Sequence, residues 1–166
     1  MTVTADTASG AFRGVIDGWF YALEQDVLAD ASVDPDDAAE LLVRTDALME
    51  ARLSTISKTA PAFSAVLRTY RRALAAGDGM LADGLISWLS GQPNVAASVK
   101  RAAGIKGDLD HFGATNFLVG LLTILRDSGF PGLVMVLDEV ETLQRMRTDT
   151  REKGLNALRQ WIDEID

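Results

Sequence analysis

Apolar residues recur at steps of three and four along most of this 166-residue chain, and this spacing constrains its fold more than any other feature. An α-helix has 3.6 residues per turn, so side chains at such steps share one face that can be buried. Proline and glycine interrupt the pattern and predict where helices begin or end. The chain is therefore predicted to be mainly α, a helical bundle of about seven helices with one or two short strands. The first helix shows the pattern in Phe12, Val15, Ile16, Trp19, Leu23 and Val27.

Punctuating residues divide the chain into predicted helices. Ser32-Val33-Asp34-Pro35 opens a second helix, because a capping side chain followed by proline is typical of a helix start. Pro61 opens a third helix and Gly77 ends it. A fourth helix is predicted from about Asp78 to Ser90, followed by a short segment around Val95 and Val99. A longer helix is predicted from about Asp108 or Asp110 to Asp127, and Gly129-Phe130-Pro131-Gly132 ends it. The chain is predicted to return to helix from Val140 to Ile165.

Leu133-Val134-Met135-Val136-Leu137 is the one credible strand in the sequence. Its five apolar residues show no helical spacing and are too few for a buried helix. A fully apolar strand needs neighbouring strands and cover on both faces, yet the sequence contains no second run of this kind. Either the strand pairs with another molecule, which predicts self-association, or its partner strands belong to a part of the protein beyond this sequence.

The composition excludes several kinds of site. Because the chain has no cysteine, it forms no disulfide framework and no zinc ribbon, and its single histidine leaves little for a transition-metal site. The longest apolar stretch, residues 117–125, is interrupted by Gly120 and Thr123 and falls short of the roughly 20 residues that span a membrane. No secretory signal is visible, so a cytoplasmic protein without membrane contact is expected.

The net charge of −8 is unevenly distributed. Residues 1–50 hold eleven acids and two bases, whereas residues 51–166 hold thirteen acids and fourteen bases. An acidic surface is a poor partner for the phosphates of nucleic acid. Residues 52–106 nevertheless hold eight bases and two acids, which predicts a solvated helix face, with a phosphate or nucleic-acid contact as the alternative. Arg68, Arg71 and Arg72 lie together there and are assigned to a solvated face or an interdomain contact.

Asp138 and Glu139 directly follow the apolar run, as in the Walker B motif of P-loop ATPases. Such a strand brings the first carboxylate to the end of the sheet, where it holds magnesium through the metal's waters. The second carboxylate orients or deprotonates the attacking water. The pattern predicts Asp138 as the cofactor-binding and metal-binding residue and Glu139 as the catalytic residue. The competing interpretation is a buried strand followed by an acidic helix cap.

A P-loop ATPase also needs the glycine-rich loop G-x-x-x-x-G-K-[ST], whose backbone cradles the phosphates. None of the four lysines follows such a loop, and the glycines at 104 and 107 have the wrong spacing around Lys106. By itself this chain is therefore predicted neither to hydrolyse ATP nor to bind it tightly. The lysines concerned are Lys58, Lys100, Lys106 and Lys153.

Several segments of the chain resemble the ATP-binding protein family of bacterial BREX phage-defence systems. The resemblance runs from about Phe12 to the end and is most specific after Pro131. Members of that family resemble AAA-type P-loop ATPases, with the phosphate-binding loop upstream of this segment and a sensor strand downstream of it. The segments that carry the resemblance are Trp19-Phe20-Tyr21, Trp88-Leu89-Ser90-Gly91-Gln92-Pro93, Gly107-Asp108-Leu109-Asp110-His111-Phe112-Gly113, Gly132 to Arg147, Arg151-Glu152-Lys153 and Leu155 to Gln160.

The resemblance implies that the chain is an internal segment of a larger α/β P-loop ATPase, retaining the magnesium and water carboxylates but not the phosphate loop. ATP and Mg²⁺ would be cofactors of the parent protein, and the partners would be the rest of that ATPase and other defence-system proteins. The implied divisions are a flexible N-terminus at residues 1–11, a helical region at 12–128, and the Walker B-like strand with following helices of the ATPase core at 129–166. The alternative is a helical interaction or assembly module without a catalytic role.

The remaining candidates each have a simpler structural interpretation. His111 could sense nucleotide, but capping or packing at a helix start is favoured. Glu141 is expected to face solvent or a helix N-terminus rather than to supplement the carboxylate pair. Arg145, Arg147 and Arg151 could reach a phosphate, yet the acids between them favour surface ion pairs. The tryptophans are expected to anchor a core or an interface: Trp19, Trp88 and Trp161.

Overall fold

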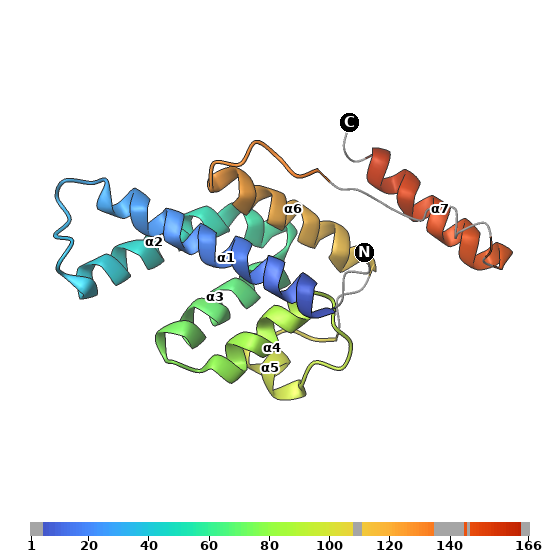
Figure 1. The fold of residues 1–166 in the computed structure, drawn as a ribbon, viewed down its shortest axis with the longest axis horizontal. Coiled ribbons are helices and arrows are strands. Elements are labelled where there is room, and N and C mark those ends of the chain that lie inside the picture. Colours follow the sequence, from blue (N-terminus) through green and yellow to red (C-terminus); the bar gives the residue numbers. More distant parts are fainter. Residues whose placement is uncertain (1–4, 108–110, 135–144, 146, 164–166) are drawn as a thin grey trace. The chain divides into compact units, whose positions relative to one another are not determined.

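Figure 1 shows the computed structural model of the chain, which describes residues 5–107, 111–134, 145 and 147–163. The chain divides into two compact units, Met1–Leu133 and Val134–Asp166. The described residues are mainly helical and none of them lies in a strand, so the predicted mainly α class is confirmed. The helices are α1 (Ala5–Leu28), α2 (Ala38–Thr59), α3 (Pro61–Ala75), α4 (Gly79–Leu89), α5 (Ala97–Ala102), α6 (His111–Asp127) and α7 (Thr148–Asp163).

The first six helices belong to the first unit and pack as a bundle (Figure 1). Neighbours in sequence pack on each other, α1 on α2, α2 on α3 and α3 on α4, as short connections between helices require. α6 returns from further along the chain to contact α1, α2 and α3. The end of α6 is thereby held by helices that come from the first half of the sequence.

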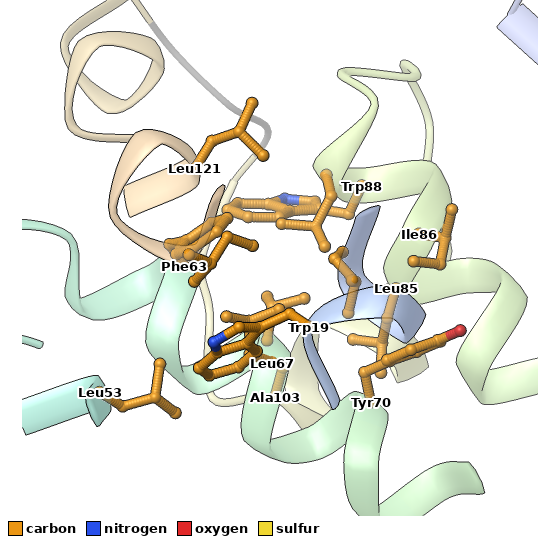
Figure 2. Close-up of a cluster of buried hydrophobic side chains, with 14 of the residues drawn as sticks. Trp19, Leu53, Phe63, Leu67, Tyr70, Leu85, Ile86, Trp88, Ala103 and Leu121 are labelled. Carbon is orange, nitrogen blue, oxygen red and sulfur yellow. The ribbon is translucent and has the colours of Figure 1, made fainter. Parts of the chain in front are cut away.

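Trp19 of α1 lies in the core of this bundle, with no exposed surface. Figure 2 shows its indole among side chains contributed by α2, α3, α4 and α6. Trp88 is buried in the same core, so the prediction that these two tryptophans anchor packing is confirmed. The side chain of Trp161 lies outside the described residues. Other members of the core include Leu53, Phe63, Leu67, Tyr70, Leu85, Ile86 and Leu121.

Among the first three helices, the observed limits follow the punctuation with two differences. Pro61 is the first residue of α3, as predicted for a helix start. Gly77, which follows the C-cap residue Ala76, has a φ of 69°, as predicted for a helix stop. The second helix starts at Ala38, later than the predicted opening at Pro35, because the Asp37 carboxylate caps it by accepting backbone N–H groups. The first helix starts at Ala5, earlier than the expected start at Phe12.

Gly120 explains how α6 approaches α3 so closely. A Cβ atom at this position would lie 2.6 Å from Cδ1 of Phe63, closer than two carbon atoms can pack. The glycine therefore admits the Phe63 ring against the backbone of α6. The ring of Phe63 also meets that of Phe117 edge-on, with centroids 5.0 Å apart.

Tyr70 carries one polar atom into the core. Its ring has no exposed surface, and its hydroxyl donates a hydrogen bond of 2.8 Å to the carboxylate of Asp17 on α1. Arg13 donates to the same hydroxyl at 3.3 Å and forms an ion pair with Asp83 of α4. Burial, together with the Asp17 carboxylate, raises the pKa of Tyr70, so the phenol stays protonated and remains the donor.

In the second unit the structure describes α7 and three residues before it, Val134, Arg145 and Arg147. α7 lies inside the range that was predicted to return to helix, but it begins at Thr148 rather than at Val140, and Arg147 directly before it is not helical. The predicted strand is described only at Leu133 and Val134, which have no regular secondary structure; its other three residues lie outside the described part. Within the described residues, no helix combines the length and the apolar character needed to cross a membrane.

Candidate functional site

The two predicted carboxylates, Asp138 and Glu139, lie outside the described residues, so their roles stay predictions. Leu133 and Val134, which precede them in the apolar run, are both exposed. No group of three or more His, Asp or Glu side chains that could hold a metal ion occurs in the described parts of the chain. The structure describes the approach to the predicted site, from the end of α6 to Val134.

The end of α6 is closed by backbone hydrogen bonds at Gly129. This glycine has a φ of 85°, and its N–H donates to the carbonyl oxygen of Arg126 at 3.0 Å. The N–H of Phe130 donates to the carbonyl oxygen of Leu125, also at 3.0 Å. This pair of bonds around a left-handed glycine is the Schellman motif, so the predicted stop at Gly129 is confirmed. It sets the direction in which the chain leaves α6 toward the apolar run.

Asp127, the last residue of α6, binds two other helices. Its Oδ2 accepts a hydrogen bond of 2.7 Å from the indole Nε1 of Trp19 on α1. Its Oδ1 lies 3.0 Å from Nη1 of Arg52 on α2, and its side chain is only 13% exposed. The same guanidinium reaches Asp26 at 3.5 Å. One carboxylate thus joins α1, α2 and α6 six residues before Leu133.

A cavity of about 420 Å³ lies beside the Asp127 carboxylate. Its walls include Trp19, Arg52, Thr55 and Thr123, so apolar and polar side chains from three helices face it. The carboxylate and the guanidinium already satisfy each other there. The cavity therefore reads as part of the packing around Asp127 rather than as a separate binding site.

A second depression, of about 830 Å³, runs between α1 and the residues that end α6. We call it the α1 groove. Gly14, Gly18 and Ala22 form its α1 side, and Phe130 lies on the side of the α6 terminus. Tyr21 lines it while 64% exposed. The groove is thus an open apolar surface next to the segment that leads to the predicted carboxylates.

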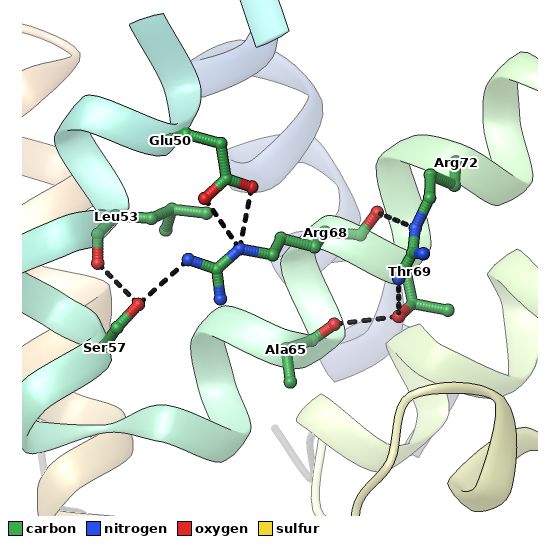
Figure 3. A network of polar contacts seen from close by, with 7 residues as sticks. All are labelled: Glu50, Leu53, Ser57, Ala65, Arg68, Thr69 and Arg72. Atoms are coloured by element: carbon green, nitrogen blue, oxygen red, sulfur yellow. Dashed lines mark hydrogen bonds and ion pairs between the residues drawn. The ribbon is translucent and has the colours of Figure 1, made fainter. Parts of the chain in front are cut away.

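Most arginines of the basic region make contacts within the bundle, as Figure 3 shows for α2 and α3. The Nε of Arg68 lies 2.7 and 2.9 Å from the two carboxylate oxygens of Glu50, and its Nη2 donates to Ser57 Oγ at 3.0 Å. Arg71 pairs with Asp46 at 3.3 Å, and Arg72 donates to Thr69 Oγ1 at 3.1 Å. The three arginines were assigned to a solvated face or an interdomain contact, but the structure pairs them with side chains of α2 and α3 and leaves Arg68 and Arg71 only 31% and 18% exposed.

The other candidates are placed as follows. His111 is the first residue of α6, as its predicted position at a helix start requires, but its side chain lies outside the described part. Glu141 also lies outside it. Arg145 and Arg147 are exposed, whereas Arg151 in α7 is half-buried. Arg145, Arg147 and Arg151 do not line either of the two cavities described above.

Asp127 is the residue whose role the sequence patterns did not indicate. A helix carries partial negative charge at its C-terminus, so an acid in the last turn is unfavourable unless a donor or cation meets it. An acid in the last turn of the predicted helix, where a base is preferred, was therefore the sequence feature that could have indicated buried partners for Asp127. Its partners could not be named from the sequence, since Trp19 lies 108 residues away.

Comparison with known proteins identifies a matching protein family. The family model described as BREX system ATP-binding protein BrxC/D matches residues 1–166. Neither the curated proteins nor the solved structures contain a significant match to the chain.

Proposed function

The chain belongs to the BREX system ATP-binding protein BrxC/D family, and we propose on this premise that it is a segment of a P-loop ATPase in a phage-defence system. In this proposal the segment comprises a helical region and the strand that carries the Walker B-like carboxylates. The observation that carries the proposal is the match of the family model to all 166 residues. The order of residues from Leu133 to Glu139, an apolar run followed by two acids, supports it.

Within the proposed site, Asp138 holds the magnesium ion and Glu139 acts on the attacking water. Carboxylate oxygens are hard ligands of the kind that Mg²⁺ prefers, and Mg²⁺ commonly keeps several waters when one or two carboxylates bind it. The donor chemistry of the pair therefore fits the metal. Mg²⁺ bound with ATP would neutralise charge on the phosphates, while Glu139 would accept a proton from the water or orient it.

The phosphate-binding loop of this ATPase is proposed to come from residues other than these 166. None of the lysines in the sequence follows a G-x-x-x-x-G loop, and backbone N–H groups of such a loop are what hold the phosphates in P-loop proteins. The chain would therefore supply the metal and water carboxylates, and another part of the parent protein would bind the nucleotide. ATP and Mg²⁺ are the cofactors of the whole.

The contacts of Asp127 support a link between the helical region and the proposed site. The carboxylate is bound to α1 and α2, and the Gly129 turn follows it directly. The end of α6 is therefore anchored to α1 and α2 shortly before the chain reaches the apolar run. We propose that the ATPase couples the state of its nucleotide to the helical region, with α6 as the element that precedes the site along the chain.

The proposed partners are the rest of the parent ATPase and other proteins of the defence system, in the cytoplasm. Leu133 and Val134 are 44% and 89% exposed, which supports self-association through the apolar run that they begin. The arginine contacts within the bundle give no support to nucleic-acid binding.

A second candidate function is a helical interaction module in which Asp138 and Glu139 only cap a helix. The α1 groove favours it, because an open, mainly apolar depression of about 830 Å³ suits a protein partner and needs no nucleotide. The two functions differ in the role of Asp138 and Glu139, which bind metal and act on water in the first and only cap a helix in the second.

Assays of ATP binding and hydrolysis by the 166-residue chain test where the phosphate loop lies. We expect no turnover above background and no tight binding by calorimetry, because the carboxylates alone cannot hold the phosphates. The Glu139→Gln variant of the chain is the control for contaminating ATPases, because the activity of a contaminant would not change with this substitution. Turnover that Glu139→Gln abolishes would contradict the proposal, since the chain would then contain a complete site.

A further inference from the structure

The α1 groove is open on the side away from the core. A Cβ atom added to Gly14 or Gly18 would meet no heavy atom within 4 Å. Tyr21 and Phe130 also line the groove and stay 64% and 57% exposed, although both are large aromatic side chains. Exposed aromatic side chains around an apolar surface are typical of protein interaction sites.

The floor of the groove is formed by small residues against which another helix could pack. Ala11, Gly14, Gly18 and Ala22 follow each other at steps of three and four, so they share one face of α1. The distance from Ala11 to Ala22 corresponds to about 16 Å of helix at 1.5 Å per residue. Small residues on such a face let two helix backbones approach closely. A partner helix of about three turns matches this length.

The end of the groove at Asp26 is strongly acidic. Between Glu24 and Glu40 the sequence has seven acids and no base. Asp26 lines the groove and its side chain is 56% exposed, although Arg52 lies 3.5 Å away. Asp30, two residues after the end of α1, is also 56% exposed, with Nη1 of Arg44 3.4 Å from its carboxylate. The C-terminus of α1 adds the negative end of its helix dipole, so this end attracts cations.

A second copy of α1 would not complement this charge. Arg13 is the one base in α1, and its guanidinium is already paired with Asp83 and bonded to the Tyr70 hydroxyl. Two copies packed through their grooves would bring further acids, and no free cation of α1, to each Asp26. A second α1 packed in this way therefore does not complement the acidic end, whereas a helix that carries basic residues does.

We propose that the α1 groove is the docking site of an amphipathic helix from a partner polypeptide. Small and apolar side chains of that helix cover Gly14 and Gly18, its larger apolar side chains meet Tyr21 and Phe130, and lysine or arginine at one end faces Asp26. The proposal uses none of the carboxylates of the ATPase site, so it stands or falls separately from the proposed function.

Selection from a display library tests this docking site. The probes are 18-residue helix-forming peptides with random surface positions, selected on the 166-residue chain. We expect the selected peptides to carry a cluster of lysine or arginine at one end of an apolar face. Their affinity should fall as salt is added, since exposed charges are screened over about 10 Å at 0.1 M ionic strength.

Variants of the chain locate the binding of the selected peptides. Gly18→Leu fills the floor of the groove, and we expect it to weaken binding by about tenfold or more, equivalent to at least about 1.4 kcal/mol. The variant keeps the fold, because the added side chain meets no neighbour at its Cβ and leucine favours a helix over glycine. Ala47→Leu, on an exposed position of α2 outside the groove, is the matched control and should leave the affinity unchanged.

Each other outcome overturns the proposal. If no peptide is enriched, or if the enriched peptides bind Gly18→Leu as well as the unaltered chain, the groove is not a helix-docking site. Neutral or acidic peptides would contradict the charge assignment. Sedimentation showing a dimer of the chain that Gly18→Leu dissociates would mean that a second copy, and not a basic partner helix, occupies the groove.

Discussion

Glu139→Gln in the full-length ATP-binding protein is expected to lower kcat for ATP hydrolysis by about 10²- to 10⁴-fold, the usual contribution of a general base. Glutamine has almost the same shape as glutamate but cannot accept the proton of the attacking water. The loss should fall on kcat, because the proposed role of Glu139 concerns the water and not the binding of ATP. Steady-state rates of phosphate release over a range of ATP concentrations measure both kcat and KM.

Glu141→Gln is the matched control for this experiment. It removes a carboxylate two residues away that is expected to face solvent or a helix start, so kcat should stay near the unaltered value. Full activity of the Glu139→Gln protein would remove the residue from the catalytic site. A similar loss in both variants would show a general effect of charge near residue 140 and not a role for one carboxylate.

Trp19→Ala is expected to destabilise the first unit by about 3–5 kcal/mol, the usual cost of replacing a buried large aromatic residue with alanine. Trp19 has no exposed surface, and its removal leaves a cavity in the core. The substitution also removes the indole N–H that donates a hydrogen bond of 2.7 Å to the Asp127 carboxylate. Equilibrium unfolding in urea, followed by circular dichroism, measures the change in the free energy of unfolding.

Two further variants separate the contributions of Trp19. Trp19→Phe keeps an aromatic ring but leaves the buried oxygen of Asp127 without this donor, at a cost of about 1–3 kcal/mol. Tyr21→Ala alters an aromatic residue of the same helix that is 64% exposed, so it should change stability little. Equal losses for Trp19→Ala and Tyr21→Ala would contradict the assignment of Trp19 to the core.

Local rules predicted the helices and several of their limits. Pro61 opens α3 and Gly129 ends α6, because a fixed φ and a left-handed φ act within one turn of the chain. The start of α2 was displaced by equally local effects. Asp30 accepts the N–H of Ser32 at 2.9 Å and Asp34 accepts that of Asp36 at 3.0 Å, so side-chain turns hold the connection out of the helix.

Contacts between distant residues could not be predicted in the same way. The sequence shows an acid at Asp127 and an indole at Trp19, but only the packing of α6 on α1 brings them together. In the sequence, Gly120 only interrupts an apolar stretch. The structure shows that it leaves room for the ring of Phe63. Asp138 and Glu139 were predicted from the residue types and their order alone, and they lie outside the described residues.

The dependence of ATP binding on Mg²⁺, compared between Asp138→Asn and Glu139→Gln in the full-length protein, tests the central claim most directly. The account predicts that Glu139→Gln binds ATP at the same Mg²⁺ concentration as the unaltered protein and does not hydrolyse it. Asp138→Asn should need more Mg²⁺ for half-maximal ATP binding, since it loses a carboxylate that holds the metal. If both variants bind and hydrolyse ATP like the unaltered protein at every Mg²⁺ concentration, the pair is not a Walker B site.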